Sequence, residues 1–229
     1  MNTRAEIKEN IEKALQAADG RARVLLATKT VPAELINYAV TCGTNLIGEN
    51  RVQELLEKYD ALDKDKMEIH FIGHLQTNKV KYIIDKVSMI HSVDSIPLAK
   101  EIEKQAAKRG ITMKVLIEVN IGNEPGKSGI PFEETETFLE ALEEFPHLLP
   151  CGLMVIPPKR ELPEENLHFF EKIYQKFIDI RTKKEDNKNW AVLSAGMSGD
   201  YLQAVSRGSN LVRVGSGVFG ARQYPTLNT

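Results

Sequence analysis

Short apolar runs alternate with longer amphipathic stretches along almost the whole chain. Runs of aliphatic residues predict buried strands, and stretches with apolar residues three or four positions apart predict helices. The strands that we expect, in chain order, span residues 23–28, 45–47, 68–72, 87–91, 113–119, 151–155, 191–193 and 211–214. Each strand after the first is reached through a helical pattern, so strand and helix alternate regularly.

The N-terminal segment predicts an additional helix before the first strand. Ile7, Ile11 and Leu15 are spaced four residues apart and would share one helix face. Thr3 and Glu6 have the spacing of a capping box, in which each side chain bonds to the backbone of the other residue. The helix is therefore expected to begin just after Thr3.

This alternation predicts the fold class. Strands joined by helices must lie parallel, and eight such units without a long linker close more naturally into a barrel than into an open sheet. We predict an α/β protein with a single-domain (β/α)8 TIM barrel that carries an extra N-terminal helix and spans residues 1–229. An open doubly wound sheet is the alternative fold.

Composition and charge exclude several classes of function. The 229 residues include 30 Lys and Arg against 32 Asp and Glu, so no basic excess is available to bind nucleic acid. Apolar runs are too short to span a membrane, and the polar N-terminus does not resemble a targeting signal. Cys42 and Cys151 are far apart, and the five histidines lack metal-ligand spacing. We therefore expect a cytoplasmic protein without a metal site.

Chemistry is expected in the loops that follow the strands, because barrels of this kind build their sites there and bind phosphate after strands seven and eight. The seventh strand is followed by a Gly- and Ser-rich stretch that includes Ser194, Met197 and Ser198, and the eighth by Gly215 and Ser216. Two such loops side by side would form a phosphate cup from backbone N–H groups. Alternatively, these residues only make tight turns.

Two basic residues would stand beside this cup. Barrel closure places the first strand next to the eighth, so Lys29 would lie close to Gly215. A buried, neutral lysine amine can attack an aldehyde, although a lysine at a strand end is often a solvated charge. Arg213 precedes Gly215 by two residues and would share its face, looking into the barrel mouth. The alternative for Arg213 is an ordinary pair with a loop carboxylate.

Taken together, the sequence blocks resemble the pyridoxal phosphate homeostasis protein family, also called the YggS/PROSC family, which is related to the N-terminal barrel of alanine racemase. The resemblance runs nearly the whole chain, and any one of its blocks would be a weak match. The blocks, in order, are Leu26 to Thr30, Gly48 to Asn50, His70 to Lys79, Lys127 to Gly129, Gly152 to Met154, Ser194 to Ser198, Val212 to Gly215 and Phe219 to Arg222.

The resemblance implies pyridoxal 5'-phosphate (PLP) as cofactor, held as an imine on Lys29. It implies that Ser194, Gly215 and Ser216 hold the phosphate. Arg213 would face the pyridine nitrogen and keep it unprotonated, which makes the ring a weak electron sink. Asn50 would lie near the cofactor, and the matched block that contains Met197 and Ser198 completes the expected cofactor site. Ser216 stands where relatives often have Thr, and it keeps the hydroxyl.

The implied function is PLP binding for intracellular PLP homeostasis, with buffering and delivery of the cofactor and little or no turnover. Alanine racemases bring a catalytic tyrosine from a second domain of a partner subunit, and this chain ends soon after the barrel. The expected partners are PLP and PLP-dependent apoenzymes, and a monomer is expected. Two alternatives stay open: a PLP-dependent enzyme resembling an amino-acid racemase, and a barrel that binds another phosphorylated metabolite with Lys29 as a counter-charge.

Overall fold

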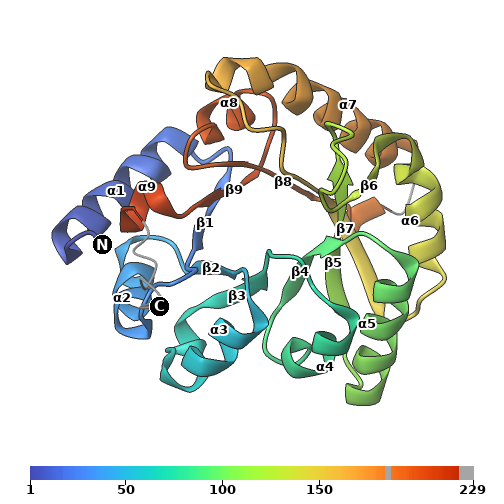
Figure 1. The fold of residues 1–229 in the computed structure, drawn as a ribbon, viewed down its shortest axis with the longest axis horizontal. Coiled ribbons are helices and arrows are strands. Elements are labelled where there is room, and N and C mark those ends of the chain that lie inside the picture. Colours follow the sequence, from blue (N-terminus) through green and yellow to red (C-terminus); the bar gives the residue numbers. More distant parts are fainter. Residues whose placement is uncertain (184–186, 222–229) are drawn as a thin grey trace, which may run out of the picture.

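The computed structural model describes residues 1–183 and 187–221, and these form a closed barrel of parallel strands inside a ring of helices (Figure 1). Neighbouring strands follow the order β4-β3-β2-β1-β9-β8-β7-β5, and pairing of β4 with β5 closes the ring. The barrel strands are β1 (Arg23–Ala27), β2 (Leu46–Glu49), β3 (Glu68–Phe71), β4 (Met89–Val93), β5 (Met113–Asn120), β7 (Leu148–Val155), β8 (Val192–Met197) and β9 (Leu211–Val214).

The predicted barrel is confirmed, and the β4–β5 pairing rules out the open sheet. All eight predicted strands are present, but several of their ends differ from the prediction. The seventh barrel strand, β8, continues to Met197 beyond the predicted residue 193, and β4 lies two residues later than predicted. Small residues such as Ser194 and Gly196 resemble a turn in sequence, yet parallel partners on both sides hold them in the sheet. A further two-residue strand, β6 (Ile130–Pro131), pairs with the end of β5.

The helices form the outer layer of the barrel. The extra N-terminal helix is confirmed, and the predicted capping box of Thr3 and Glu6 is formed. This helix packs beside α2 and α9, where the Asn2 N–H donates to the Phe219 carbonyl at 2.9 Å. The helices are α1 (Arg4–Ala18), α2 (Ala33–Ala39), α3 (Val52–Lys58), α4 (Val80–Ile83), α5 (Ile96–Arg109), α6 (Thr135–Glu143), α7 (Leu167–Lys183), α8 (Tyr201–Ser206) and α9 (Ser216–Phe219).

The main hydrophobic core lies between the strands and the helices, and the barrel interior has a different composition. Alternate strand residues face outward, where side chains such as Leu26 and Val212 join one large apolar cluster. The interior holds two small apolar clusters and a set of buried polar side chains. The polar set includes His70, His91 and Arg213. Within residues 1–183 and 187–221, no helix has the length and apolar character needed to cross a membrane.

The contact between β7 and β8 depends on a glycine. Gly152 has φ +147°, and a Cβ atom at this residue would lie 1.8 Å from the Val192 carbonyl oxygen. We predict that Gly152→Ala lowers the free energy of unfolding by at least about 2 kcal/mol, because the two strands must separate locally. Urea denaturation followed by circular dichroism measures the change. Gly199→Ala is the control, since no atom would contact its Cβ, and equal stability losses for both variants would contradict the prediction.

Candidate cofactor site at the carboxyl ends of the strands

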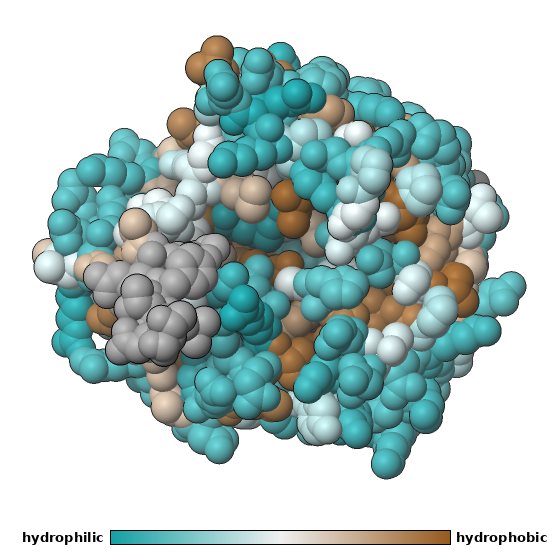
Figure 2. All heavy atoms as spheres, in the orientation of Figure 1, coloured by the Kyte–Doolittle hydropathy of each residue, from teal (hydrophilic) through white to brown (hydrophobic). Residues whose placement is uncertain are grey.

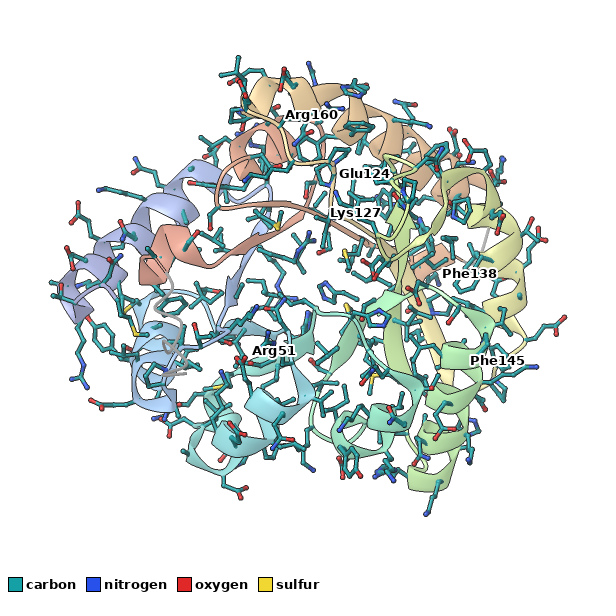
Figure 3. All side chains as sticks on the ribbon, in the orientation of Figure 1. Arg51, Glu124, Lys127, Phe138, Phe145 and Arg160 are labelled. Atoms are coloured by element: carbon teal, nitrogen blue, oxygen red, sulfur yellow. The ribbon has the colours of Figure 1, made fainter. Side chains whose placement is uncertain are left out.

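The loops that follow the strands gather around one mouth of the barrel. Figure 3 shows Glu124 and Lys127 on the loop after β5 and Arg160 on the loop after β7, all on this face. The space-filling view of the same face has a hollow at its centre, where hydrophilic and hydrophobic residues meet (Figure 2). This is the end of the barrel where the sequence predicts the chemistry.

A pocket of about 270 Å³ opens in this mouth. Its apolar walls are Ala27, Ile72 and Ile156, contributed by or directly following three different strands. The predicted site residues that line it are Asn50, Met197, Ser198, Arg213, Gly215 and Ser216. Closure of the barrel thus brings together residues that are more than 160 positions apart in the sequence.

Two backbone amides converge on Ser198, a residue that lines this pocket. The N–H groups of Gly215 and Gly217 both donate to the Ser198 hydroxyl oxygen, each over 3.1 Å. Ser198 belongs to the loop after β8, whereas both glycines follow β9, so the two predicted loops do meet. Convergent amides and a hydroxyl are groups that bind phosphate oxygens well.

Lys29 lies beside this pocket, two residues beyond the end of β1. It lines a small adjoining cavity whose wall includes Ala27, Gly215 and Ser216, three residues that also line the main pocket. A buried ion pair supports the turn from below. The Lys58 ammonium donates to the Thr28 carbonyl at 2.9 Å and pairs with the Glu49 carboxylate at 2.7 Å. The Lys58 amine is therefore engaged in holding the backbone next to Lys29.

Arg213 is almost completely buried, and its guanidinium is fixed by three hydrogen bonds. Nη1 donates to the Ser194 carbonyl at 2.8 Å and to the Ser194 hydroxyl at 2.6 Å, and Nη2 donates to the Val155 carbonyl at 2.8 Å. Burial lowers the pKa of Arg213 to about 10, which leaves the side chain charged at neutral pH. The acceptors are thus carbonyls and a hydroxyl, and Arg213 is one of the residues that line the pocket.

Ser194 is placed differently from the other predicted site residues. Its side chain is fully buried inside the barrel and does not border the pocket. The hydroxyl accepts from Arg213 and contacts His91 Nδ1 at 3.2 Å. A direct contact of Ser194 with phosphate stays a prediction, and in this structure the residue supports Arg213 from below.

Known proteins resemble this chain over almost its whole length. Residues 3–223 match the family model described as "Alanine racemase, N-terminal domain". The pyridoxal phosphate homeostasis protein of Aquifex aeolicus is 44% identical over 223 residues, which cover 96% of this chain and 97% of that protein. The chain belongs to the pyridoxal phosphate homeostasis protein family.

Several solved structures have the same fold as this chain. The structure of PipY from Synechococcus elongatus, described as having PLP bound, aligns with a TM-score of 0.82 at 28% identity and covers 93% of this chain and all (100%) of that chain. Alanine racemase from Corynebacterium glutamicum aligns with a TM-score of 0.74 at 17% identity, covering 98% of this chain and 62% of that chain. The second likeness shows the shared fold alone.

Glu118 was not among the residues predicted from the sequence, yet it lies at the edge of the site. Glu118 is buried on β5 and lines a second pocket of about 320 Å³ that shares Asn50, Ile72 and Ile156 with the first. Glu118 Oε2 and Asn50 Oδ1 are buried without a hydrogen-bond partner in the structure. The alternation of β5 could have indicated Glu118, because its neighbours Ile117 and Val119 both face the outer core.

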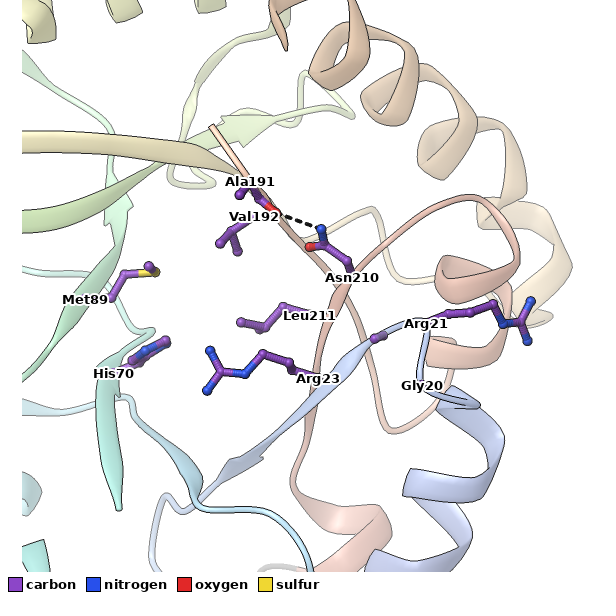
Figure 4. Close-up of a pocket in the computed structure, with 10 residues that line it drawn as sticks. Gly20, Arg21, Arg23, His70, Met89, Ala191, Val192, Asn210 and Leu211 are labelled. Atoms are coloured by element: carbon purple, nitrogen blue, oxygen red, sulfur yellow. Dashed lines mark hydrogen bonds between the residues drawn. The ribbon is translucent and has the colours of Figure 1, made fainter. Parts of the chain in front are cut away.

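The opposite end of the family barrel also contains a pocket, and it is larger, about 480 Å³ (Figure 4). Arg23 and His70 point toward one another across it, and Arg23 pairs with the Glu68 carboxylate at 2.6 Å. This pocket lies at the amino ends of the strands, away from the loops that build sites in this fold. Among the described residues, no group of three or more His, Cys, Asp or Glu side chains is arranged to hold a metal ion.

The buried Glu118 predicts a pH dependence of stability. Burial, reinforced by Asp94, raises its pKa from 4.5 to about 7. Between these values the folded carboxyl keeps a proton that the unfolded chain has released, so stability falls as the pH rises. The fall is on the order of 3 kcal/mol. Glu118→Gln should lack this contribution, so the difference in unfolding free energy between the wild-type protein and the variant, measured by urea denaturation between pH 4.5 and 8, should fall by about this amount as the pH rises.

The control for this experiment is Glu124→Gln, on the exposed loop after β5. This variant should keep the decline of the wild-type protein. If Glu118→Gln showed the same pH profile as the wild-type protein, Glu118 would not carry the raised pKa.

Proposed function

We propose that the protein binds PLP at the mouth of the barrel, through an imine with Lys29, and serves intracellular PLP homeostasis by buffering and delivering the cofactor. One observation carries the proposal: Lys29, Arg213 and Gly215 line two adjoining pockets, and the Gly215 and Gly217 amides converge on Ser198, which lines the larger of the two. The names of the relatives and the description of PipY with PLP bound support it.

The residues around the pocket fit the different parts of PLP. A phosphate dianion would replace the Ser198 hydroxyl oxygen as acceptor for the Gly215 and Gly217 amides, with the Ser216 hydroxyl beside it. The apolar walls from Ile72 and Ile156 would contact the ring. Asn50, with an unsatisfied oxygen, could accept a hydrogen bond from the ring or its substituents. Bound PLP would supply a reactive aldehyde carbon. The protein would supply the Lys29 amine and the groups that bind the phosphate and the ring.

Arg213 favours storage over turnover. A guanidinium is a hydrogen-bond donor only, so a pyridine nitrogen that faces it stays unprotonated and draws electrons weakly. Among the described residues, no tyrosine lines the main pocket or the adjoining pocket of Glu118. We therefore propose that the protein catalyses little or no turnover. The proposed recipients of the cofactor are PLP-dependent apoenzymes.

We further propose that the protein acts in the cytoplasm as a monomer. Cys42 and Cys151 are both free thiols in the structure, which suits a reducing compartment. The barrel encloses its core within one chain, so no second subunit is needed for folding. Size-exclusion chromatography with light scattering tests the monomer.

Glu118 favours a second candidate function, a racemase-like PLP enzyme. A buried carboxyl with its pKa raised to about 7 can exchange protons at neutral pH, and it lies on a pocket that adjoins the cofactor pocket. Steady-state turnover of free amino acids that is lost in both Lys29→Ala and Glu118→Gln would support this function. Absence of turnover, or a rate independent of Lys29, would exclude it.

The central prediction concerns covalent attachment at Lys29. After incubation with PLP, borohydride reduction and proteolysis, mass spectrometry should locate one stable adduct on Lys29. The imine absorbance should vanish in Lys29→Ala, because no other amine would be positioned against the bound aldehyde. Lys127→Ala, which removes another lysine near the mouth, should retain the band.

Two outcomes would contradict the proposed function. An adduct on another lysine would move the attachment site. Lack of any adduct, combined with binding of a different phosphorylated metabolite, would support the alternative in which Lys29 is only a counter-charge.

A further inference from the structure

A continuous chain of hydrogen bonds crosses the interior of the barrel from one end to the other. From the cofactor pocket downward, Arg213 Nη1 contacts Ser194 Oγ at 2.6 Å and Ser194 Oγ contacts His91 Nδ1 at 3.2 Å. His91 Nε2 lies 2.8 Å from His70 Nδ1, and His70 Nε2 lies 2.9 Å from Glu68 Oε1. The chain ends at Arg23, which donates to Glu68 in the pocket of Figure 4.

The members of this hydrogen-bond chain come from five different strands, β1, β3, β4, β8 and β9, and only the folded barrel brings them together. The side chains of His70, His91 and Ser194 are completely buried, and Arg213 is 4% exposed. Buried polar groups are costly unless each is satisfied, so a complete chain of this length is a strong constraint on the interior.

Only one arrangement of protons satisfies every member. The Glu68 carboxylate, whose pKa is lowered to about 2 mainly by the bond from His70, accepts, so His70 Nε2 carries a hydrogen. Burial lowers the pKa of both histidines, which makes them neutral. His70 Nδ1 must then accept from His91 Nε2, and His91 Nδ1 must accept from the Ser194 hydroxyl.

This direction of donation matters for Arg213. Because the Ser194 hydrogen points to His91, the serine oxygen presents lone pairs to the guanidinium. Without an acceptor at His91, the hydroxyl would be free to turn its hydrogen elsewhere, and the short bond to Arg213 would weaken. One of the three hydrogen bonds that orient Arg213 is therefore linked to two histidines that lie outside the cofactor pocket.

We propose that His91 and His70 are positioning residues that hold the Arg213 guanidinium in place for the cofactor, through a single directed chain of hydrogen bonds from Arg213 to Glu68. This inference rests on the proposed function, because it assigns Arg213 to the pyridine nitrogen. The tautomers of both histidines are part of the proposal: each carries its hydrogen on Nε2.

The first test needs no cofactor. In the wild-type protein without PLP, nitrogen NMR of labelled histidine should find His70 and His91 neutral at pH 7, with hydrogen on Nε2 and none on Nδ1. Two variants, His70→Gln and His91→Gln, assign the signals. A hydrogen on Nδ1 of either residue would overturn the proposed direction, whatever the protein does with PLP.

The second test asks whether the chain affects the cofactor. His91→Phe removes the acceptor but fills the volume, and it should weaken PLP binding about tenfold and shift the absorbance of the bound cofactor. His91→Gln keeps an acceptor and a donor and should restore part of the affinity. In an Arg213→Gln background, His91→Phe should have no additional effect, because its influence acts through Arg213.

The surface variant His147→Phe, which breaks a pair with Glu103, is the matched control and should bind PLP like the wild-type protein. If His91→Phe does not fold, His70→Phe removes the next member of the same hydrogen-bond chain and should give a loss and a spectral shift in the same direction. Wild-type affinity and spectrum in the folded variants would overturn the positioning role. If the wild-type protein formed no imine at all, the proposed function would fail. The NMR result would still test the direction of the hydrogen bonds from Ser194 to Glu68.

Discussion

The candidate site depends above all on the parallel pairing of β1 with β9, the first and last strands of the barrel. Leu25 pairs with Arg213 and Leu26 with Val214, and this register sets the ends of both strands at one level. As a result the turn that carries Lys29 lies next to Gly215. A slip of one residue would turn Arg213 out of the barrel, because side chains alternate between the two faces of a strand. The pairing of β1 with β9 therefore joins the two ends of the chain in the barrel and also brings the residues of the site together.

Enclosing a guanidinium in a barrel requires compensation, and the structure supplies it with polar groups in place of an ion pair. Arg213 reaches two backbone carbonyls and one hydroxyl. Desolvation of a charge is expensive, and hydrogen bonds to carbonyl dipoles offset part of the cost, with further electrostatic stabilisation from Glu118 and Asp200. The result is a positive charge held in a fixed orientation at the border of the pocket.

The two ends of the barrel differ in a way that pocket size does not reveal. The pocket at the amino ends is larger, but Arg23 and Glu68 neutralise one another there. The smaller pocket at the carboxyl ends has a backbone amide, a buried arginine and an amide oxygen without a hydrogen-bond partner on its wall. Unsatisfied and convergent polar groups indicate a ligand more strongly than volume does, because such groups are costly unless a ligand satisfies them.

The regular alternation of strand and helix was enough to predict the barrel, because it leaves few topologies for parallel strands. It also predicted that Lys29, Arg213 and the loop residues Gly215 and Ser216 would lie near one another, because residues at strand ends follow the chain order. The position of Ser194 could be found only from the tertiary structure, in which it lies within β8 and accepts a hydrogen bond from Arg213. Its linkage to His91 joins residues 103 positions apart in the sequence. Hydrogen bonds across a barrel depend on register and strand tilt, and no local pattern of hydrophobic and polar residues encodes them.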